Sequence, residues 1–142
     1  MNLEVLGEIG AAAQEVASGA REDGFHLAIA VVDAGGHLLH FHRDPRARLV
    51  TVTTAIGKAR CAVLFDRSTE TTVEIAQGNP LAFSSFVAAS EMPFVIGHGG
   101  EIVHSAEATV AVGVAGANAE QDDALAKHLA ELIQATMAEQ RA

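Results

Sequence analysis

The chain has 142 residues, of which 49% are hydrophobic, and its formal net charge is −9. This length fits one domain of ordinary size, so we expect a single domain over residues 1–142. The hydrophobic content excludes a disordered chain, and the negative charge argues against nucleic acid and anionic membranes as partners. No apolar run is long enough to cross a bilayer, and residues 1–10 lack the basic segment of an export signal, which predicts a cytoplasmic protein.

The first part of the chain predicts a helix followed by a β-hairpin. Apolar and small residues recur at helical spacing over residues 3–22. Residues 26–33 are a continuous apolar run, which is typical of a strand covered on both faces. Asp33–Gly36 provides glycines for a tight turn, and residues 37–43 form the partner strand.

The rest of the chain predicts two helices, three short strands and a last helix. The last helix begins with a capping pattern at Asn118 and Gln121 and ends near Glu139, and residues 81–91 fit no element. The two helices are predicted over residues 47–65 and 69–77, and the three strands over residues 94–96, 101–104 and 109–115. The order α-β-β-α-α-β-β-β-α predicts an α+β fold, with a single antiparallel sheet of about five strands flanked by helices.

The second strand of the hairpin carries an unusual number of histidines. Strict alternation would place Leu38, His40 and His42 on one face of this strand. Two imidazoles at this spacing can face one metal ion or one haem iron. The alternative is a polar face at a sheet edge or a subunit contact. A metal site would need a third ligand from elsewhere, and the candidates are His98, His104 and Glu101.

Two other segments could contact a ligand. The loop Gly97–Gly100 has His98 at its centre, and its glycines let the backbone approach a ligand closely; the alternative is a hairpin with an incidental histidine. Lys58 lies among small apolar residues, where it could anchor a carboxylate or act as an acid. The alternative is a lysine that extends along the surface to solvent.

Most of the basic residues lie in one zone of an acidic chain. Six of the nine Lys and Arg residues fall between positions 43 and 67, which favours a small anionic ligand there; the alternative is solvated helix faces with ion pairs. Cys61 is the only cysteine, which excludes an internal disulfide and a thiolate zinc cluster. The six basic residues are Arg43, Arg46, Arg48, Lys58, Arg60 and Arg67.

An ordered set of motifs resembles the GlcG/HbpS-like family, which includes the C-terminal domain of PduO. The hairpin reads Ala30-Val31-Val32-Asp33-Ala34-Gly35-Gly36-His37-Leu38, followed by Arg43. Later blocks are Lys58–Ala62, Phe65–Thr69, Gly99–Val103, Gly113–Ala117 and Gln121–Asp122, so the resemblance covers about residues 3–138. It implies a helix-flanked antiparallel sheet in dimers that assemble further, and either haem or corrinoid binding or an enzyme acting on small aromatic hydroxylamino compounds. His40 departs from the family, which often has alanine there.

Three functions remain open from the sequence. The first is non-covalent binding of haem or another flat anionic ligand, with His40 or His42 at the iron. The second is a cofactor-free lyase or isomerase acting on a small aromatic or carboxylated substrate, with His40, His98 and Lys58 as catalytic residues. The third is a structural subunit; in every case we expect a homo-oligomer, a dimer or larger. The ligand-binding candidates are His37, His42, Arg43, Lys58, Gly99, Gly100 and Glu101.

Overall fold

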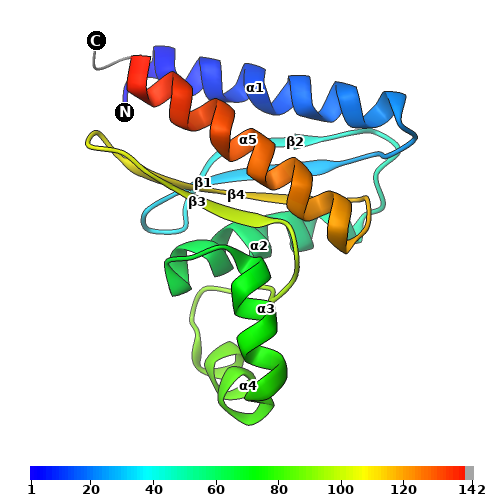
Figure 1. Cartoon of the computed structure of the whole chain (residues 1–142), viewed down its shortest axis with the longest axis vertical. Helices are drawn as coiled ribbons and strands as arrows, with labels where there is room; N and C mark the ends of the chain where they lie inside the picture. The colour runs from blue at the N-terminus through cyan, green and yellow to red at the C-terminus, as the bar shows by residue number, and fades with distance from the viewer. Residues whose placement is uncertain (140–142) are drawn as a thin grey trace.

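The computed structural model describes residues 1–139, which form a four-stranded antiparallel sheet with helices on both faces (Figure 1). The strand order is β2-β1-β4-β3, and each neighbouring pair is antiparallel. This architecture confirms the predicted α+β class. In chain order the elements are α1 (Leu3–Glu22), β1 (Ala28–Asp33), β2 (Leu38–Arg43), α2 (Val50–Phe65), α3 (Thr69–Gly78), α4 (Pro80–Ala89), β3 (Gly100–His104), β4 (Thr109–Ala115) and α5 (Ala119–Glu139).

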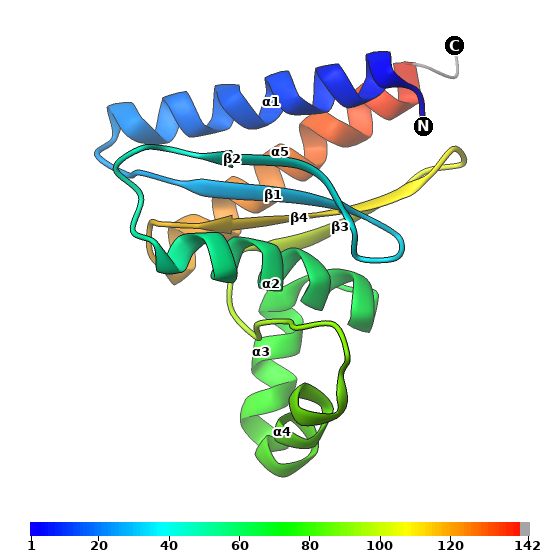
Figure 2. The ribbon, with the colours of Figure 1, turned by 180° about the vertical axis from the view of Figure 1, so that it is seen from behind.

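The sheet has one strand fewer than predicted, and there is one additional helix. Residues 94–96 form no strand, because they pass beside α2 instead of another strand, where the Val95 N–H donates to the Gly57 carbonyl over 3.1 Å. The additional helix is α4, which covers most of the stretch 81–91 that fitted no element and begins just before it at Pro80, a residue suited to the first turn of a helix. Together, α3 and α4 form an arm, residues 69–89, that projects away from the sheet (Figures 1 and 2).

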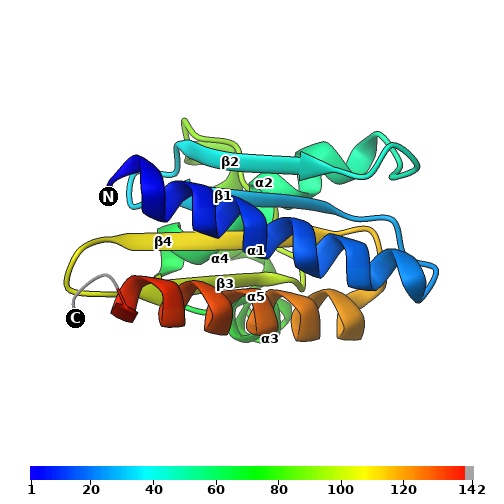
Figure 3. The same ribbon diagram turned by 90° about the horizontal axis from the view of Figure 1, so that it is seen from above.

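The upper face of the sheet is covered by α1 and α5. Seen from above, α1 runs along β1 and β2, while α5 runs along β3 (Figure 3). The side chains of Ile9, Leu27, Ile29, Leu129 and Ile133 are completely buried between these helices and the sheet. Their burial provides the main apolar core of the domain.

The lower face of the sheet packs directly on the backbone of α2. The buried residues between them are mostly alanines, including Ala55 and Ala59 of α2. A Cβ added to Gly113 of β4 would lie 1.9 Å from the Ala55 carbonyl oxygen. Glycine at this position therefore lets the helix approach the sheet closely.

A bulge in β2 changes which side chains share a face. Val31 pairs with His40 and Val32 pairs with Leu38, so Leu39 is an extra residue in the strand. As a result, His40 shares the upper face with Val31, while Leu38 shares the lower face with Val32. The prediction that Leu38, His40 and His42 share one face of the strand is therefore wrong.

Among residues 1–139, no helix combines the length and the apolar character needed to cross a membrane.

Candidate functional site

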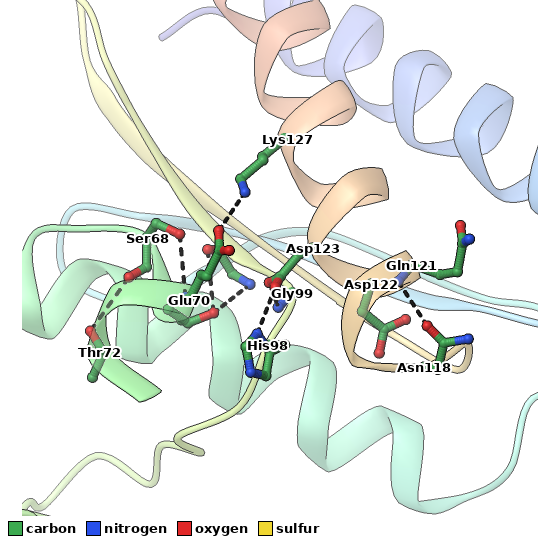
Figure 4. A network of polar contacts seen from close by, with 12 residues as sticks. Ser68, Glu70, Thr72, His98, Gly99, Asn118, Gln121, Asp122, Asp123 and Lys127 are labelled. Carbon is green, nitrogen blue, oxygen red and sulfur yellow. Dashed lines mark hydrogen bonds and ion pairs between the residues drawn. The ribbon is translucent and has the colours of Figure 1, made fainter. Parts of the chain in front are cut away.

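Two adjacent aspartates at the start of α5 contact two of the predicted site residues, Lys58 and His98. Figure 4 shows the two aspartates with His98 beside Asp123. The Lys58 ammonium lies 3.2 Å from Asp122 Oδ2, and His98 Nδ1 lies 2.6 Å from Asp123 Oδ2. The first turn of α5 is fixed by Asn118, whose side chain accepts a hydrogen bond from the Gln121 N–H over 2.8 Å. This cap, which the sequence predicted, helps to place both carboxylates.

The Lys58–Asp122 pair is buried. Their side chains are only 10% and 8% exposed. Lys58 also donates to the Val114 carbonyl over 2.9 Å, and Asp122 Oδ1 accepts from the Ala117 N–H over 3.0 Å. Burial raises the pKa of Asp122, and the nearby Lys58 ammonium partly opposes that rise. Lys58 therefore links α2, β4 and α5 and is engaged with protein acceptors.

His98 is held in one orientation at the edge of a groove. Because an ionised carboxylate only accepts hydrogen bonds, the Asp123 contact requires a proton on Nδ1, and the neutral form of His98 then carries its lone pair on Nε2. The groove has a volume of about 490 Å³, and we call it the His98 groove. Three acidic side chains line it, together with Lys127, which pairs with Glu70. Its lining residues are Glu70, His98, Ala119, Glu120, Asp123, Ala124 and Lys127.

The predicted glycines position this network, and both of their N–H groups have protein acceptors. The Gly99 N–H donates to Asp123 Oδ1 over 2.7 Å, and the Gly100 N–H donates to Thr69 Oγ1 over 2.8 Å. Gly99 has a φ of +110°, and a Cβ there would lie 2.5 Å from the Val114 carbonyl oxygen. Glu101, the next predicted residue, is half-buried on β3, and this burial raises the pKa of its carboxyl group.

A second groove lies at the start of α2, and we call it the basic groove. It has a volume of about 530 Å³ and combines His26, Arg46, Arg48 and Lys58 with small and apolar residues. The first turn of α2 has no side-chain cap and no acidic residue, which leaves its positive dipole uncompensated. The ion pairs found within residues 1–139 do not involve Arg46 or Arg48. The remaining lining residues are Gly24, Phe25, Ala47, Val50, Thr51, Thr54, Ala115, Gly116 and Ala117.

His26 is oriented by a buried carboxylate. Its Nδ1 lies 3.3 Å from Asp44 Oδ2, and Arg21 binds both oxygens of Asp44 over 2.8 and 2.9 Å. The Arg21 guanidinium, with the Arg46 N–H, holds the pKa of Asp44 far below its usual range. Asp44 is therefore an anion that accepts the Nδ1 proton, and the neutral form of His26 then carries its lone pair on Nε2.

The other predicted residues lie apart from both grooves. His40 lies beneath α1 near Gly10, where its Nε2 is buried without a hydrogen-bond partner, and burial lowers its pKa. His42 lines a separate depression beside Arg21 and Asp44. His37 is exposed at the hairpin turn. Arg43 donates to the carbonyls of the 44–47 turn over 3.2 to 3.4 Å.

These positions separate the hairpin histidines from the network around Lys58. His40 and His42 face α1 above the sheet, whereas Lys58 comes from α2 below it. Within the described part of the chain, no three His, Cys, Asp or Glu side chains are arranged to hold a metal ion. Sequence reasoning missed His26, Asp44 and Asp123, since no local motif marks contacts between residues 18 to 25 positions apart.

Comparison with known protein families identifies the family of this chain. The model of the family described as haem degrading protein HbpS-like matches residues 1–131. The chain belongs to the HbpS-like family. This confirms the resemblance found in the motifs. A search of curated proteins gave no significant match.

Three solved structures have the same fold over nearly all of this chain. Klebsiella pneumoniae protein ORFY is 26% identical, with a TM-score of 0.79 over 95% of this chain and 91% of that one. A double mutant of Streptomyces reticuli HbpS is 28% identical, with a TM-score of 0.74 over 93% and 86%. A complex of PduOC with haem is 23% identical, with a TM-score of 0.77 over 93% and 94%, which shows a common fold.

Proposed function

We propose that this HbpS-like protein binds haem, or another flat anionic ligand, non-covalently in the basic groove. The observation that carries the proposal is the pairing of His26 with Asp44 beside two guanidinium groups that have no acidic partner in residues 1–139. The family description names haem, and a protein with the same fold was crystallised with it. The groove volume of about 530 Å³ falls within the usual range for small-molecule sites.

The residues of the basic groove fit the chemical groups of haem. Bound haem would supply an iron that takes an imidazole nitrogen as a ligand and two propionates that need cations. His26 offers its Nε2 nitrogen, and the Asp44 carboxylate contacts Nδ1 and orients the ring, as partner carboxylates do for metal-binding histidines. Arg46 and Arg48 offer guanidinium groups for the propionates. This fit supports His26 as the ligand of the iron, in place of His40 or His42, which the sequence favoured.

Haemin titration followed by absorbance tests this proposal. We expect wild-type protein to shift the Soret band and His26→Ala to lose the axial-ligand signature. An Arg46→Ala, Arg48→Ala double variant should bind haemin at least about tenfold more weakly, or about 1.4 kcal/mol. The matched control is His37→Ala, which removes an exposed histidine at the hairpin turn. An unshifted haemin spectrum with wild-type protein would refute the proposal.

The His98–Asp123 contact supports a second candidate function, acid–base catalysis without a cofactor. The oriented Nε2 of His98 could accept a proton from a substrate in the His98 groove, as a lyase or isomerase requires. The test substrate is a small aryl hydroxylamine without a carboxylate, because three acidic side chains line the groove. We expect turnover to be lost in His98→Ala and Asp123→Asn, with unchanged circular dichroism, and retained in His26→Ala. Equal turnover in wild type and His98→Ala would exclude this role.

A further inference from the structure

His40 lies beneath α1 with one ring nitrogen buried and unpaired. It pairs with Val31 of β1, so its side chain points to the upper face of the sheet, along which α1 runs (Figure 3). The ring packs against Gly10, where an added Cβ would lie 3.1 Å from Cε1 and 3.2 Å from Nδ1 of His40. Within residues 1–139, Nε2 of His40 is the one buried side-chain nitrogen or oxygen without a hydrogen-bond partner. The helix therefore covers the ring without satisfying it.

The elements packed against this ring offer it no opposite charge within the described part of the chain. The inward residues of α1 are apolar or small, and all of its charged residues are exposed. On β1, the carboxylate of Asp33 accepts hydrogen bonds from the amides of the hairpin turn. On β2, His42 acts on the ring by disfavouring a second positive charge beside it. The exposed charged residues of α1 are Glu4, Glu8, Glu15, Arg21 and Glu22.

Protonation of His40 would place a charged N–H where no acceptor is present. Burial lowers the pKa of His40, and the neighbouring His42 adds to that effect. Because the packed form resists the proton, an open form in which the ring reaches water binds it more readily. Acid therefore favours opening, and neutral pH favours packing. One pH unit below the ordinary histidine pKa of 6.5, this preference can reach about tenfold.

The helix above the ring is suited to local opening. It contains Gly7, Gly10 and Gly19, and glycine in the interior of a helix is destabilising relative to alanine. At Gly7 and Gly19 an added Cβ would meet no atom within 4 Å, so close packing does not require glycine there. Segments of low intrinsic stability open at a lower free-energy cost than the whole domain. A small change in the balance at His40 can therefore act on α1 alone.

We infer that His40 is a pH-sensitive latch: its neutral ring packs beneath α1, and its protonation in mild acid loosens this helix from β2. Opening would expose the upper face of β2, which carries His42 as well as His40. The layer between α2 and the lower face of the sheet would stay packed, because its residues do not contact this ring. The inference is independent of the ligand proposed for either groove.

Hydrogen exchange followed by mass spectrometry tests the latch element by element. After correction for intrinsic exchange rates, amides of α1 should exchange at least about threefold faster at about pH 5.5 than at about pH 7, because the open form gains the proton. Peptides from α2 and β4 should keep their protection. In His40→Leu, which has an apolar side chain of similar size, α1 should lose this pH dependence. The matched control is His37→Leu at the exposed turn, which should behave like wild type.

Three outcomes would overturn the inference. The first is protection of α1 that does not change with pH, or that changes equally in wild type and His40→Leu. The second is an equal loss of protection in α1, α2 and β4, which would show global unfolding. The third concerns the wild-type ring, followed by NMR, and it decides the question if His40→Leu does not fold. Protonation of His40 that leaves the α1 amide signals unchanged in the same pH interval would refute the latch.

Discussion

Replacing Lys58 with methionine should leave the buried Asp122 carboxylate without its counter-ion. At an effective dielectric constant of about 20, two unit charges 3.2 Å apart attract each other by about 5 kcal/mol. Both side chains are almost completely excluded from water, so solvent screens this attraction only weakly. Removing one partner of a buried pair typically costs about 3–5 kcal/mol. We therefore expect Lys58→Met to lose about that much free energy of unfolding at pH 7.

The loss should depend on pH with a defined sign. Burial raises the pKa of Asp122 in the folded state, and the Lys58 ammonium partly lowers it. Without the ammonium, this pKa rises further. A raised folded-state pKa favours the folded protein at low pH, and the benefit is lost as pH rises through that pKa. The stability difference between Lys58→Met and wild type should therefore be smaller in acid, at about pH 4, than at pH 7, because protonation of Asp122 removes the unpaired charge.

Urea unfolding followed by circular dichroism measures both effects, since the chain has no tryptophan or tyrosine for fluorescence. The double variant Lys58→Met, Asp122→Asn removes both charges, and its cost should be smaller than the sum of the two single costs. A loss below about 1 kcal/mol at pH 7 would contradict the expected cost of an unpaired buried charge. An equal loss at both pH values would show that Asp122 does not titrate as argued.

Two further predictions concern packing and acid stability. Gly113→Ala should lower the free energy of unfolding by about 1–3 kcal/mol or more, the usual range for overpacking, because the added Cβ meets the backbone of α2. The control, Gly7→Ala, lies in open space on α1 and should raise the free energy of unfolding by about 0.5–1 kcal/mol. The urea concentrations at the midpoints of unfolding measure both effects, and similar losses of stability in the two variants would refute the packing argument. Asp44→Asn should destabilise the protein at neutral pH, and the difference should shrink in acid, because the depressed pKa of Asp44 stabilises the fold only while it is ionised. Superimposable acid-unfolding curves would contradict this.

Elements with a clear hydrophobic period could be predicted from the sequence, and those without one could not. Residues 3–22 and 109–115 match α1 and β4 because each has one consistent pattern of burial. In contrast, α4 lacks a charged face, so helical periodicity was not visible in it. Residues 94–96 have strand-like composition but no strand beside them. A strand depends on a partner, which a local pattern does not reveal.

The candidate site was only partly predictable for a related reason. His98 and Lys58 were chosen by residue type, and the structure does place them on adjacent aspartates. His26 does not stand out in the sequence, although the hairpin pairs Ala28 with Arg43. This pairing brings the residues just before β1 next to those just after β2. Extending that register by one residue would have placed Asp44 near His26. The strand alternation used for His40 and His42 did not include the bulge at Leu39.

The close contact between α2 and the sheet also limits how this domain can change during evolution. Any side chain larger than hydrogen at Gly113 collides with the helix backbone, and the surrounding alanines leave little space for larger residues. New ligand specificity therefore cannot arise by hollowing out this layer. Substitutions in the turn after Arg43 and at the start of α5 alter the two grooves without touching this layer. One rigid interior can in this way support divergent chemistry at its rim.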